Sequence, residues 1–235
     1  AYISTNEKRE LDRKEKKKII KYVSSGIFSR IGQTMVASTD SIIISTYIGT
    51  VAVGLYSNYN MIYANLDTLI YMIFSNLTPS VGNYAVSKEK DQLYSLFKNI
   101  SLLNYFIVCI ISVCFYCLVS PFIVLWVGKQ YLLSDVTVVI IALNFYIATN
   151  QNCIINFMNA NGELYYRNRY RALIEGGINI VASVLLVKYT NLGMTGVFLG
   201  TTICFMFGRI WMDARVLYKY WFQVPFSEYL KSYVE

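Results

Sequence analysis

The run from Ile100 to Trp126, ISLLNYFIVCIISVCFYCLVSPFIVLW, contains no charged residue. A helix needs about 20 predominantly apolar residues to cross the hydrocarbon core of a bilayer, and this run is long enough. Other long apolar stretches lie on both sides of it, the fifth in chain order being the shortest. The sequence therefore predicts an all-α, polytopic membrane protein with six spanning helices, at about 19–48, 53–84, 100–126, 136–158, 172–187 and 192–211.

Basic residues alternate between the connections that join these stretches. The connection from Gly49 to Ala52 has no Lys or Arg, and the third and fifth connections have only Lys129 and Lys188. The other connections and the N-terminal segment are basic, and such loops stay in the cytoplasm. We therefore expect the first helix to leave the cytoplasm and the sixth to return to it. The expected cytoplasmic cations include Lys14, Lys16, Lys17, Lys18, Lys88, Lys90, Lys98, Arg167, Arg169, Arg171, Arg209, Arg215 and Lys219.

The segments outside the six stretches have a different character. Residues 1–18 are strongly charged and are expected to form a cytoplasmic linker between two lobes, with the six-helix lobe at 19–215. Residues 216–235 mix aromatic and charged side chains, which is typical of an amphipathic segment at the membrane interface. The chain starts at Ala1 with no apolar stretch before the charged leader, so we expect a fragment of a longer protein.

Composition excludes several classes of function. The formal net charge is +7, but the excess lies in the leader and the cytoplasmic turns, where orientation and anionic lipid explain it, so no nucleic-acid partner is expected. The chain has no histidine, which excludes Ser-His-Asp hydrolysis and histidine-ligated zinc or haem. No Walker A run or dinucleotide fingerprint occurs either. We expect no cofactor, no metal site and no disulfide, since all five cysteines lie in apolar stretches.

Polar side chains inside the first helix are the strongest candidates for a functional site, because such groups usually face a bundle interior or a cavity. On a helical wheel, Arg30, Thr34 and Ser41 share one side, with Gln33 and Asp40 on its flank. A cation backed by hydrogen-bond donors suits an anionic headgroup. Alternatively, Arg30 extends to the cytoplasmic headgroups or pairs with a carboxylate.

The fourth and second helices contribute amides. Asn144, Gln151, Asn152 and Asn159 share one side of the fourth helix. Amides both donate and accept hydrogen bonds, so they suit sugar hydroxyls or phosphate oxygens, but they also join membrane helices to one another. The second helix has two polar sides, formed by Asn58, Asn65 and Asn76 on one and by Asn60 and Asp67 on the other.

Residues at regular spacing in the fifth and sixth expected helices are interpreted mainly as contacts between helices. Arg171, Glu175, Asn179 and Ser183 recur every four residues, which favours an Arg171–Glu175 pair and leaves a substrate or coupling-ion site as the alternative. Like Asp67, Glu175 is therefore either a coupling or a structural ionisable group. The sixth helix has a stripe of small residues that permits close helix contact. The stripe is formed by Gly196, Gly200, Cys204 and Gly208.

Several short motifs follow one another in an order that suggests a family. They are Asp40-Ser-Ile-Ile-Ile-Ser-Thr-Tyr-Ile-Gly49, Val53-Gly-Leu-Tyr-Ser57, Pro79-Ser-Val-Gly-Asn83, Pro121-Phe-Ile-Val-Leu-Trp-Val-Gly128, Ala160-Asn-Gly-Glu-Leu-Tyr165 and Gly193-Met-Thr-Gly-Val-Phe-Leu-Gly-Thr201. Together they resemble the C-terminal lobe of bacterial polysaccharide flippases of the Wzx type, over nearly the whole chain. These flippases belong to a superfamily that also contains multidrug and toxin extrusion antiporters and the lipid II flippase.

The resemblance implies one six-helix lobe of a two-lobe transporter, with a central cavity that opens alternately to each side. It implies a multi-pass protein of the bacterial cytoplasmic membrane that moves undecaprenyl-diphosphate-linked oligosaccharide to the outer leaflet for O-antigen, capsule or related polymers. Its partners would be this lipid-linked substrate, membrane lipid and the missing N-terminal lobe. In this scheme Arg30 meets the diphosphate and the amides of the second and fourth helices contact the sugars.

Two other functions stay open. A cation-coupled multidrug antiporter of the same superfamily would use Asp40 or Asp67 for the coupling ion. A membrane-embedded subunit or glycan-processing enzyme is less compatible with a chain that lacks histidine and close carboxylate pairs. The amide-rich helices and Arg30 favour the flippase, which is not an enzyme in the bond-making sense.

Overall fold

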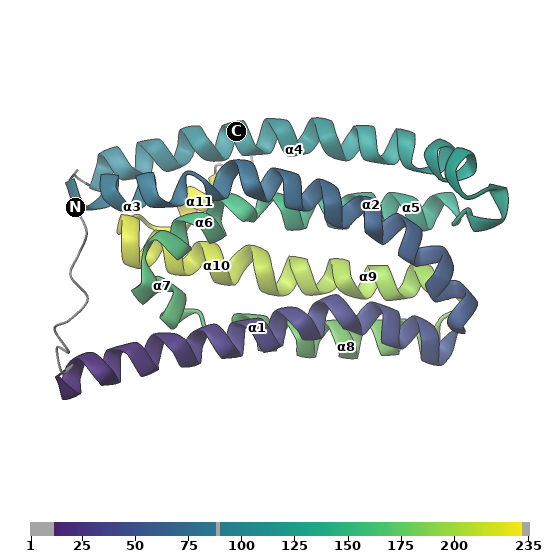
Figure 1. The fold of residues 1–235 in the computed structure, drawn as a ribbon, viewed down its shortest axis with the longest axis horizontal. Coiled ribbons are helices and arrows are strands. Elements are labelled where there is room, and N and C mark those ends of the chain that lie inside the picture. Colours follow the sequence, from purple (N-terminus) through teal and green to yellow (C-terminus); the bar gives the residue numbers. More distant parts are fainter. Residues whose placement is uncertain (1–11, 88–89, 232–235) are drawn as a thin grey trace, which may run out of the picture.

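The computed structural model describes residues 12–87 and 90–231, and every regular element in this part is helical (Figure 1), as the apolar stretches predict. The α-helices are α1 Arg13–Tyr47, α2 Thr50–Ser75, α3 Thr78–Ser87, α4 Lys90–Trp126, α5 Asp135–Asn150, α6 Asn152–Ala160, α7 Gly162–Arg167, α8 Arg171–Tyr189, α9 Met194–Cys204, α10 Ile210–Leu217 and α11 Phe226–Lys231. A 3-10 turn, η1, covers Lys129–Tyr131, and two π-helical turns are η2 Phe205–Arg209 and η3 Tyr218–Phe222.

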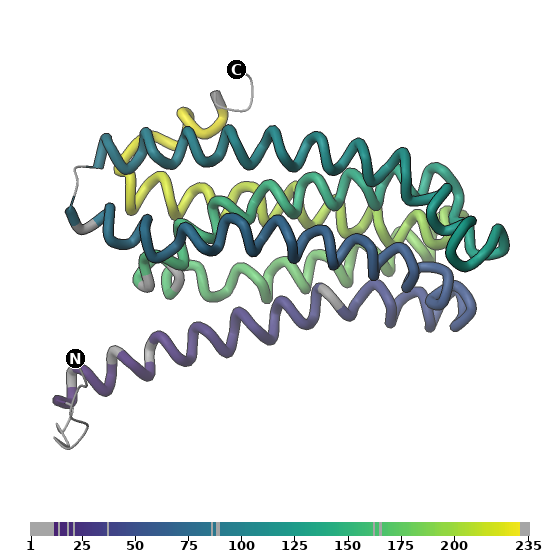
Figure 2. Tube along the Cα trace, turned by 45° about the horizontal axis from the view of Figure 1, so that its top comes forward, coloured from purple at the N-terminus to yellow at the C-terminus, as the bar shows by residue number. Residues whose placement is uncertain are grey.

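The long helices lie side by side and roughly antiparallel (Figures 1 and 2). One end of the bundle holds the start of α1 together with α3, α7 and α11, and we call it the basic end because Lys90, Arg167 and Arg215 belong to the segments there. The opposite end holds three turns, each with a glycine at positive φ. These are Gly49 at 126°, Gly128 at 105° and Gly193 at 54°. The basic connections of the sequence thus lie at one end of the bundle, and the connections with few basic residues lie at the other.

The first helix begins within the charged leader rather than after it. Asp12 caps the helix, its side chain accepting from the Arg13 N–H while Glu15 accepts from the Asp12 N–H at 3.1 Å. This capping box starts α1 at Arg13, six residues before the start expected for the first apolar stretch, and the division between linker and lobe stays a prediction. The part of the expected linker before Asp12 lies outside the described residues. In Figure 2 the first half of α1 diverges from the other helices.

Two of the expected helices are broken, and the last one is longer than expected. The second stretch divides at Asn76 into α2 and α3, and the fourth divides at Gln151 into α5 and α6. The sixth, expected over 192–211, continues through η2, α10 and η3 to Phe222. The reason is burial, because Tyr218 and Phe222 pack with Phe97 and Phe157 in one aromatic cluster.

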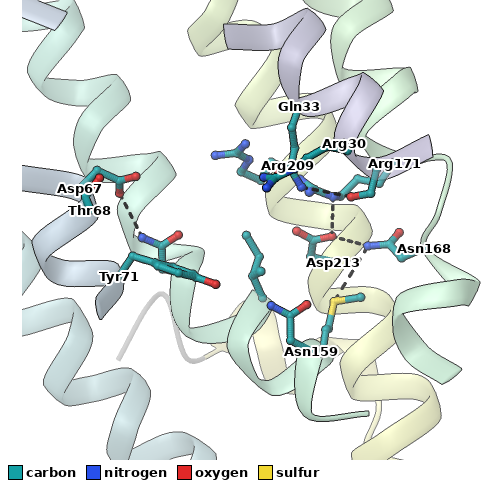
Figure 3. Close-up of a pocket in the computed structure, with 14 residues that line it drawn as sticks. Arg30, Gln33, Asp67, Thr68, Tyr71, Asn159, Asn168, Arg171, Arg209 and Asp213 are labelled. Atoms are coloured by element: carbon teal, nitrogen blue, oxygen red, sulfur yellow. Dashed lines mark hydrogen bonds and ion pairs between the residues drawn. The ribbon is translucent and has the colours of Figure 1, made fainter. Parts of the chain in front are cut away.

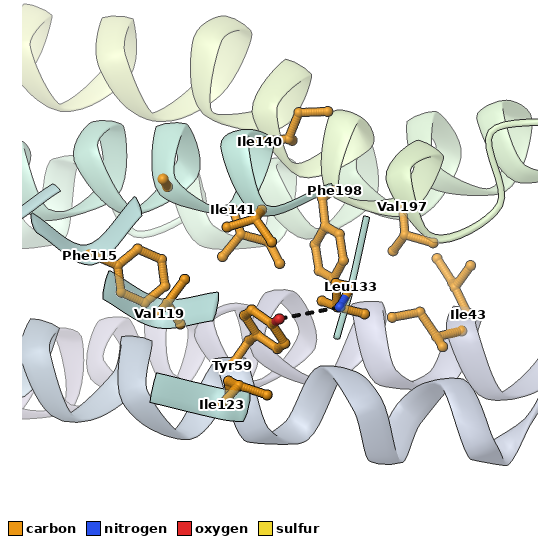
Figure 4. Packing of buried hydrophobic residues seen from close by; sticks show 13 residues of the cluster. Ile43, Tyr59, Phe115, Val119, Ile123, Leu133, Ile140, Ile141, Val197 and Phe198 are labelled. Carbon is orange, nitrogen blue, oxygen red and sulfur yellow. Dashed lines mark hydrogen bonds between the residues drawn. The ribbon is translucent and has the colours of Figure 1, made fainter. Parts of the chain in front are cut away.

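A large apolar cluster joins the helices at the opposite end of the bundle. Tyr59 of α2 is fully buried there, and its hydroxyl accepts a hydrogen bond from the Leu133 N–H at 3.2 Å (Figure 4). Phe198 of α9 and Ile43 of α1 belong to the same cluster. This cluster packs the helices together at one end of the bundle, and the aromatic cluster packs them together at the other. The polar residues between the two clusters therefore lie on helices that are held at both ends.

Four helical segments of the described chain are long and apolar enough to cross a membrane, namely Lys90–Trp126, Asp135–Ala160, Arg171–Tyr189 and Met194–Phe222. Helices α1 and α2 run alongside them (Figure 1) but are less apolar, because α1 begins with a charged run and α2 contains Asn58, Asn60, Asn65 and Asp67. A six-span topology stays a prediction for these two helices.

Candidate translocation cavity

A cavity lined by charged, polar and apolar side chains lies between α1 and α2. It has two compartments, of about 490 Å³ and about 450 Å³, which share Gln33, Asp67, Thr68, Asn152 and Arg209. The first compartment lies nearer the basic end and the second nearer the opposite end. The first is also lined by Ser29, Arg30, Tyr71, Ile155, Met158, Asn159, Asn168, Arg171 and Asp213, and the second by Val36, Asp40, Tyr56, Asn60, Tyr63, Ala64, Ile141, Asn144, Ala148, Glu175, Phe198, Thr201 and Phe205.

The packing of α1 on α8 decides which α1 side chains face this cavity. A Cβ atom on Gly32 would lie 2.5 Å from backbone and side-chain carbons of Ala172, so the two helices touch at this glycine. With Gly32 against α8, the cavity receives Arg30, Gln33 and Asp40. The structure places Thr34 and Ser41 outside both compartments, although the helical wheel groups them with Arg30.

Four charged residues form a cluster, of which Arg171, Arg209 and Asp213 line the first compartment (Figure 3) and Glu175 lines the second. Arg171 lies at its centre, with Nη1 2.8 Å from Glu175 Oε1 and Nε 3.0 Å from Asp213 Oδ1. Arg209 is more distant, with Nε 3.7 Å from the same Glu175 oxygen. Asn168 also donates to Asp213. The predicted Arg171–Glu175 pair is confirmed, and it is part of a larger cluster whose charges cancel.

Asp40 lies in a different polar network. The carboxylate is buried, and its oxygens accept from the hydroxyl of Thr201, at 3.1 and 3.2 Å. Asn179 donates to the same hydroxyl at 3.2 Å, and Ser183 donates to Asn179 at 3.2 Å. Within the described residues no ion pair involves Asp40. The network joins α1, α8 and α9 and leaves the negative charge of Asp40 without a bound cation.

The amides of α5 and α6 have mixed roles. Asn152 donates to Asp67 Oδ1 at 3.1 Å, and Thr149 donates to the same oxygen at 2.8 Å. Asn144 donates to the carbonyl of Phe198 at 2.9 Å and accepts from Thr202 at 2.7 Å, so it joins helices as well as lining the cavity. Asn159, near the basic end, is exposed and lines the first compartment.

Three other predicted amides lie elsewhere. Asn58 and Asn65 donate to carbonyl oxygens of their own helix, at 3.2 Å to Gly54 and 2.7 Å to Met61. Asn65 lines an apolar groove between α2 and α4, on the other side of α2 from the cavity. Gln151 is buried at the break between α5 and α6 and lines neither compartment. The polar side of α2 that faces the cavity is the one with Asn60 and Asp67.

Sequence reasoning missed several cavity residues. The sequence predicts Arg209 only as a cytoplasmic cation, and it does not single out Asp213 as a site residue. Tyr56 and Tyr63 carry no sequence signal that separates them from the other tyrosines. The position of Arg209 depends on the π-helical turn η2, which changes the direction in which side chains leave the helix.

Charge is separated along the cavity. The first compartment has three arginines, Arg30, Arg171 and Arg209, against two acids, Asp67 and Asp213. The second has three acids, Asp40, Asp67 and Glu175, against Arg209 alone. The half nearer the basic end therefore favours an anion, and the other half offers carboxylates, amides and tyrosines.

An all-helical bundle with four candidate membrane-spanning helices in its described part has the architecture of a polytopic membrane protein. The chain belongs to the polysaccharide biosynthesis protein family, whose model matches residues 2–135. Its fold is similar to that of a MOP superfamily transporter from Pyrococcus furiosus Vc1 (DSM3638), described as having a binding pocket of reverse polarity that suggests a different function. The TM-score is 0.69 at 14% identity, over 86% of this chain.

The match covers 44% of the archaeal transporter, so this chain spans less than half of that protein's length. No curated protein matches the chain. The sequence match shows the family, and the solved structure adds a similar fold.

Proposed function

We propose that this chain is one lobe of a flippase for diphosphate-linked oligosaccharide lipids in a bacterial cytoplasmic membrane. The observation that carries the proposal is the separation of charge along one continuous cavity. A lipid-linked oligosaccharide has the matching composition, since an anionic diphosphate lies next to the membrane lipid and neutral polar sugars follow it. Membership of a polysaccharide biosynthesis family supports the same substrate class.

The diphosphate would bind in the first compartment, next to Arg30. This side chain is exposed within the cavity, and among the described residues no hydrogen bond or ion pair involves it. A guanidinium group matches phosphate with two parallel N–H donors. Arg30 is therefore available to a ligand, whereas Arg171 is held between Glu175 and Asp213.

The sugars would occupy the second compartment. Asn60, Asp67 and Asn144 offer donors and acceptors to hydroxyl groups there, and Tyr56 and Tyr63 offer aromatic rings. The carboxylates repel a diphosphate, so the charge pattern would keep the anionic group in the first compartment. Such a division fixes the orientation of the substrate in the cavity.

A second lobe would complete the cavity, and the lipid tail would remain in the bilayer. The proposal rests on the fold, because the chain covers less than half of a transporter with the same architecture. The isolated chain in liposomes should then move no lipid-linked sugar, whereas the intact transporter should. Activity of the isolated chain would require a homodimer that supplies the second lobe, or a different mechanism.

The decisive experiment compares two substitutions of Arg30 in the intact transporter. Export of surface polysaccharide should fall strongly in Arg30→Ala and partly recover in Arg30→Lys, because loss of a charged contact weakens headgroup binding by roughly ten- to a hundredfold. Lys16→Ala is the matched control, since Lys16 is an exposed cation of the same helix outside the cavity. Normal export by Arg30→Ala at normal protein levels would mean that Arg30 is only a membrane anchor.

A cation-coupled multidrug antiporter is the second candidate. The observation that favours it is Asp40, a buried carboxylate in the second compartment with no cation beside it in the described structure. In such a protein Asp40 would bind the coupling ion, and the tyrosines would hold an organic cation. The two candidates make opposite predictions for Asp40→Asn.

A further inference from the structure

Arg209 occupies a special position, at the junction of the two compartments. It is the last residue of the π-helical turn η2, and it lines both parts of the cavity. In Figure 3 its side chain extends from the α10 side toward the space between Arg30 and the wall that holds Asp67. A residue at this point can contact a ligand in either compartment.

The contacts of Arg209 are weak for a side chain that is only 17% exposed. Its Nε makes no hydrogen bond within the described residues, and its ion pair with Glu175 is long, at 3.7 Å. The guanidinium carbon lies 4.6 Å from the centroid of the Phe205 ring, which holds the group in place without using its donors. An arginine has five N–H donors, so a buried one with an unused Nε is costly unless something else binds it.

The acids of the cluster bind Arg171 more closely than they bind Arg209. Arg171 is 8% exposed, and it takes the same Glu175 oxygen at 2.8 Å and Asp213 at 3.0 Å. Arg171 is therefore the better-placed cation for both acids, while Asp213 Oδ2 has no hydrogen-bond partner within the described residues. Arg171 supports the fold, whereas Arg209 lines both compartments and makes no ion pair shorter than 3.7 Å within the described residues.

We propose that Arg209 is a second phosphate ligand and that, together with Arg30, it selects diphosphate over monophosphate lipids. The inference rests on the proposed function and adds a specificity determinant to it. Arg30 from α1 and Arg209 from η2 approach the first compartment from two different helices (Figure 3), so each can take one phosphate group of a diphosphate. A lipid with a single phosphate group leaves one of the two guanidinium groups without an anion.

Glu175 has a defined part in this scheme. Its carboxylate is 1% exposed and competes with the phosphate for Arg209 across the 3.7 Å contact. When the substrate binds, Arg209 exchanges this long contact for a charged hydrogen bond to phosphate. When the substrate leaves, Arg209 returns to Glu175, so the empty cavity does not keep an uncompensated cation.

The test measures binding of two probes to the purified intact transporter in detergent, farnesyl-diphospho-N-acetylglucosamine and farnesyl-phospho-N-acetylglucosamine. The wild type should bind the diphosphate probe about tenfold or more tightly than the monophosphate probe. Arg209→Gln should bind the diphosphate probe about tenfold more weakly and the monophosphate probe nearly as before, so the preference disappears. Arg209→Lys should keep part of the preference, because it retains the charge.

Controls separate a ligand role from a structural one. Arg215→Gln removes an exposed cation from α10 outside the cavity and should change neither affinity. Glu175→Gln frees Arg209 from its competitor and should tighten the diphosphate probe, a result that a purely structural Arg209 would not give. If Arg209→Gln does not fold, the Lys variant and Glu175→Gln carry the test.

Three results would overturn the inference, and they differ from failure of the proposed function. An unchanged preference in Arg209→Gln would exclude Arg209 as a ligand. An equal loss for both probes with a lower melting temperature would make it structural. A preference lost in Arg30→Ala but kept in Arg209→Gln would leave the flippase proposal standing without this residue. A wild type that binds neither probe would instead refute the proposed function, and the inference with it.

Discussion

The hydroxyl oxygen of Thr201 faces both carboxylate oxygens of Asp40, at 3.1 Å from one and 3.2 Å from the other. The contact joins α9 to α1 across the wall of the second compartment. Because Thr201 also receives a hydrogen bond from Asn179, the hydroxyl is oriented toward the carboxylate. Asp40 is thus satisfied by neutral donors, and its charge has no cation to balance it among the described residues.

Asp40→Asn distinguishes the two candidate functions. The amide oxygen can still accept from Thr201, so a flippase that uses Asp40 only as a polar wall residue should retain export within about twofold. The measurements, at equal protein level, are surface polysaccharide in cells that lack their own flippase and efflux of an organic cation, which only the antiporter would transport. An antiporter needs the ionisable group, so complete loss of transport in a variant that folds normally would favour the cation-coupled alternative.

Arg171→Leu should destabilise the protein, whereas Arg167→Leu should not. Both arginines pair with a glutamate four residues away at 2.8 Å, but Arg171 is buried, while Arg167 and Glu163 are largely exposed. Removing Arg171 leaves Glu175 and Asp213 buried without their main cation, at a cost of roughly 3–5 kcal/mol. An exposed pair contributes little. Thermal unfolding in detergent measures the difference, and equal melting temperatures would contradict a structural role for Arg171.

Much of the fold could be predicted from hydrophobicity and charge, because a bilayer requires helices of a known length. The recurrence of Arg171, Glu175 and Asn179 every four residues predicted a polar face on the fifth helix, and that face is buried in the structure. When polar residues repeat on one face over several turns, that whole face of the helix must turn toward the protein interior. Helix ends were less predictable, since capping by Asp12 and burial of Phe222 depend on local geometry and on tertiary contacts.

The side of α1 that faces the cavity could not be predicted. The helical wheel grouped Thr34 and Ser41 with Arg30, but only a knowledge of the neighbouring helix shows that Gly32 packs on α8 and turns Gln33 inward. Arg209 was harder still, because a regular helix does not place it as the π-helical turn does. Cavity residues depend on packing between distant segments, and the period of one helix does not contain that information.

Gly200→Ala should disturb the contact of α8 with α9, and Gly177→Ala should not. A Cβ on Gly200 would lie 2.2 Å from the Ser183 hydroxyl oxygen and 2.6 Å from its backbone nitrogen, whereas one on Gly177 meets nothing within 4 Å. Overpacking of this kind costs about 1–3 kcal/mol, and an unhindered Gly-to-Ala change in a helix stabilises by roughly 0.5–1 kcal/mol. Melting temperatures should therefore move in opposite directions. A tolerated Gly200→Ala would show that the two helices separate easily.

The basic end of the bundle should face the cytoplasm, which single cysteines can test. In a background without the five native cysteines, residues at the two ends are replaced one at a time and treated with a membrane-impermeant thiol reagent in intact cells. Ser87→Cys and Glu163→Cys, exposed at the basic end, should stay unlabelled until the membrane is permeabilised.

Gln130→Cys and Asn191→Cys, exposed at the opposite end, should react in intact cells. The physical reason is that Lys and Arg are retained on the cytoplasmic side during insertion, and the short turns of the opposite end have few of them. Labelling of Ser87→Cys from outside would show that the bundle has the opposite orientation in the membrane. The arginines of the first compartment would then face the outer leaflet, and the cavity could not receive a diphosphate from the cytoplasmic side.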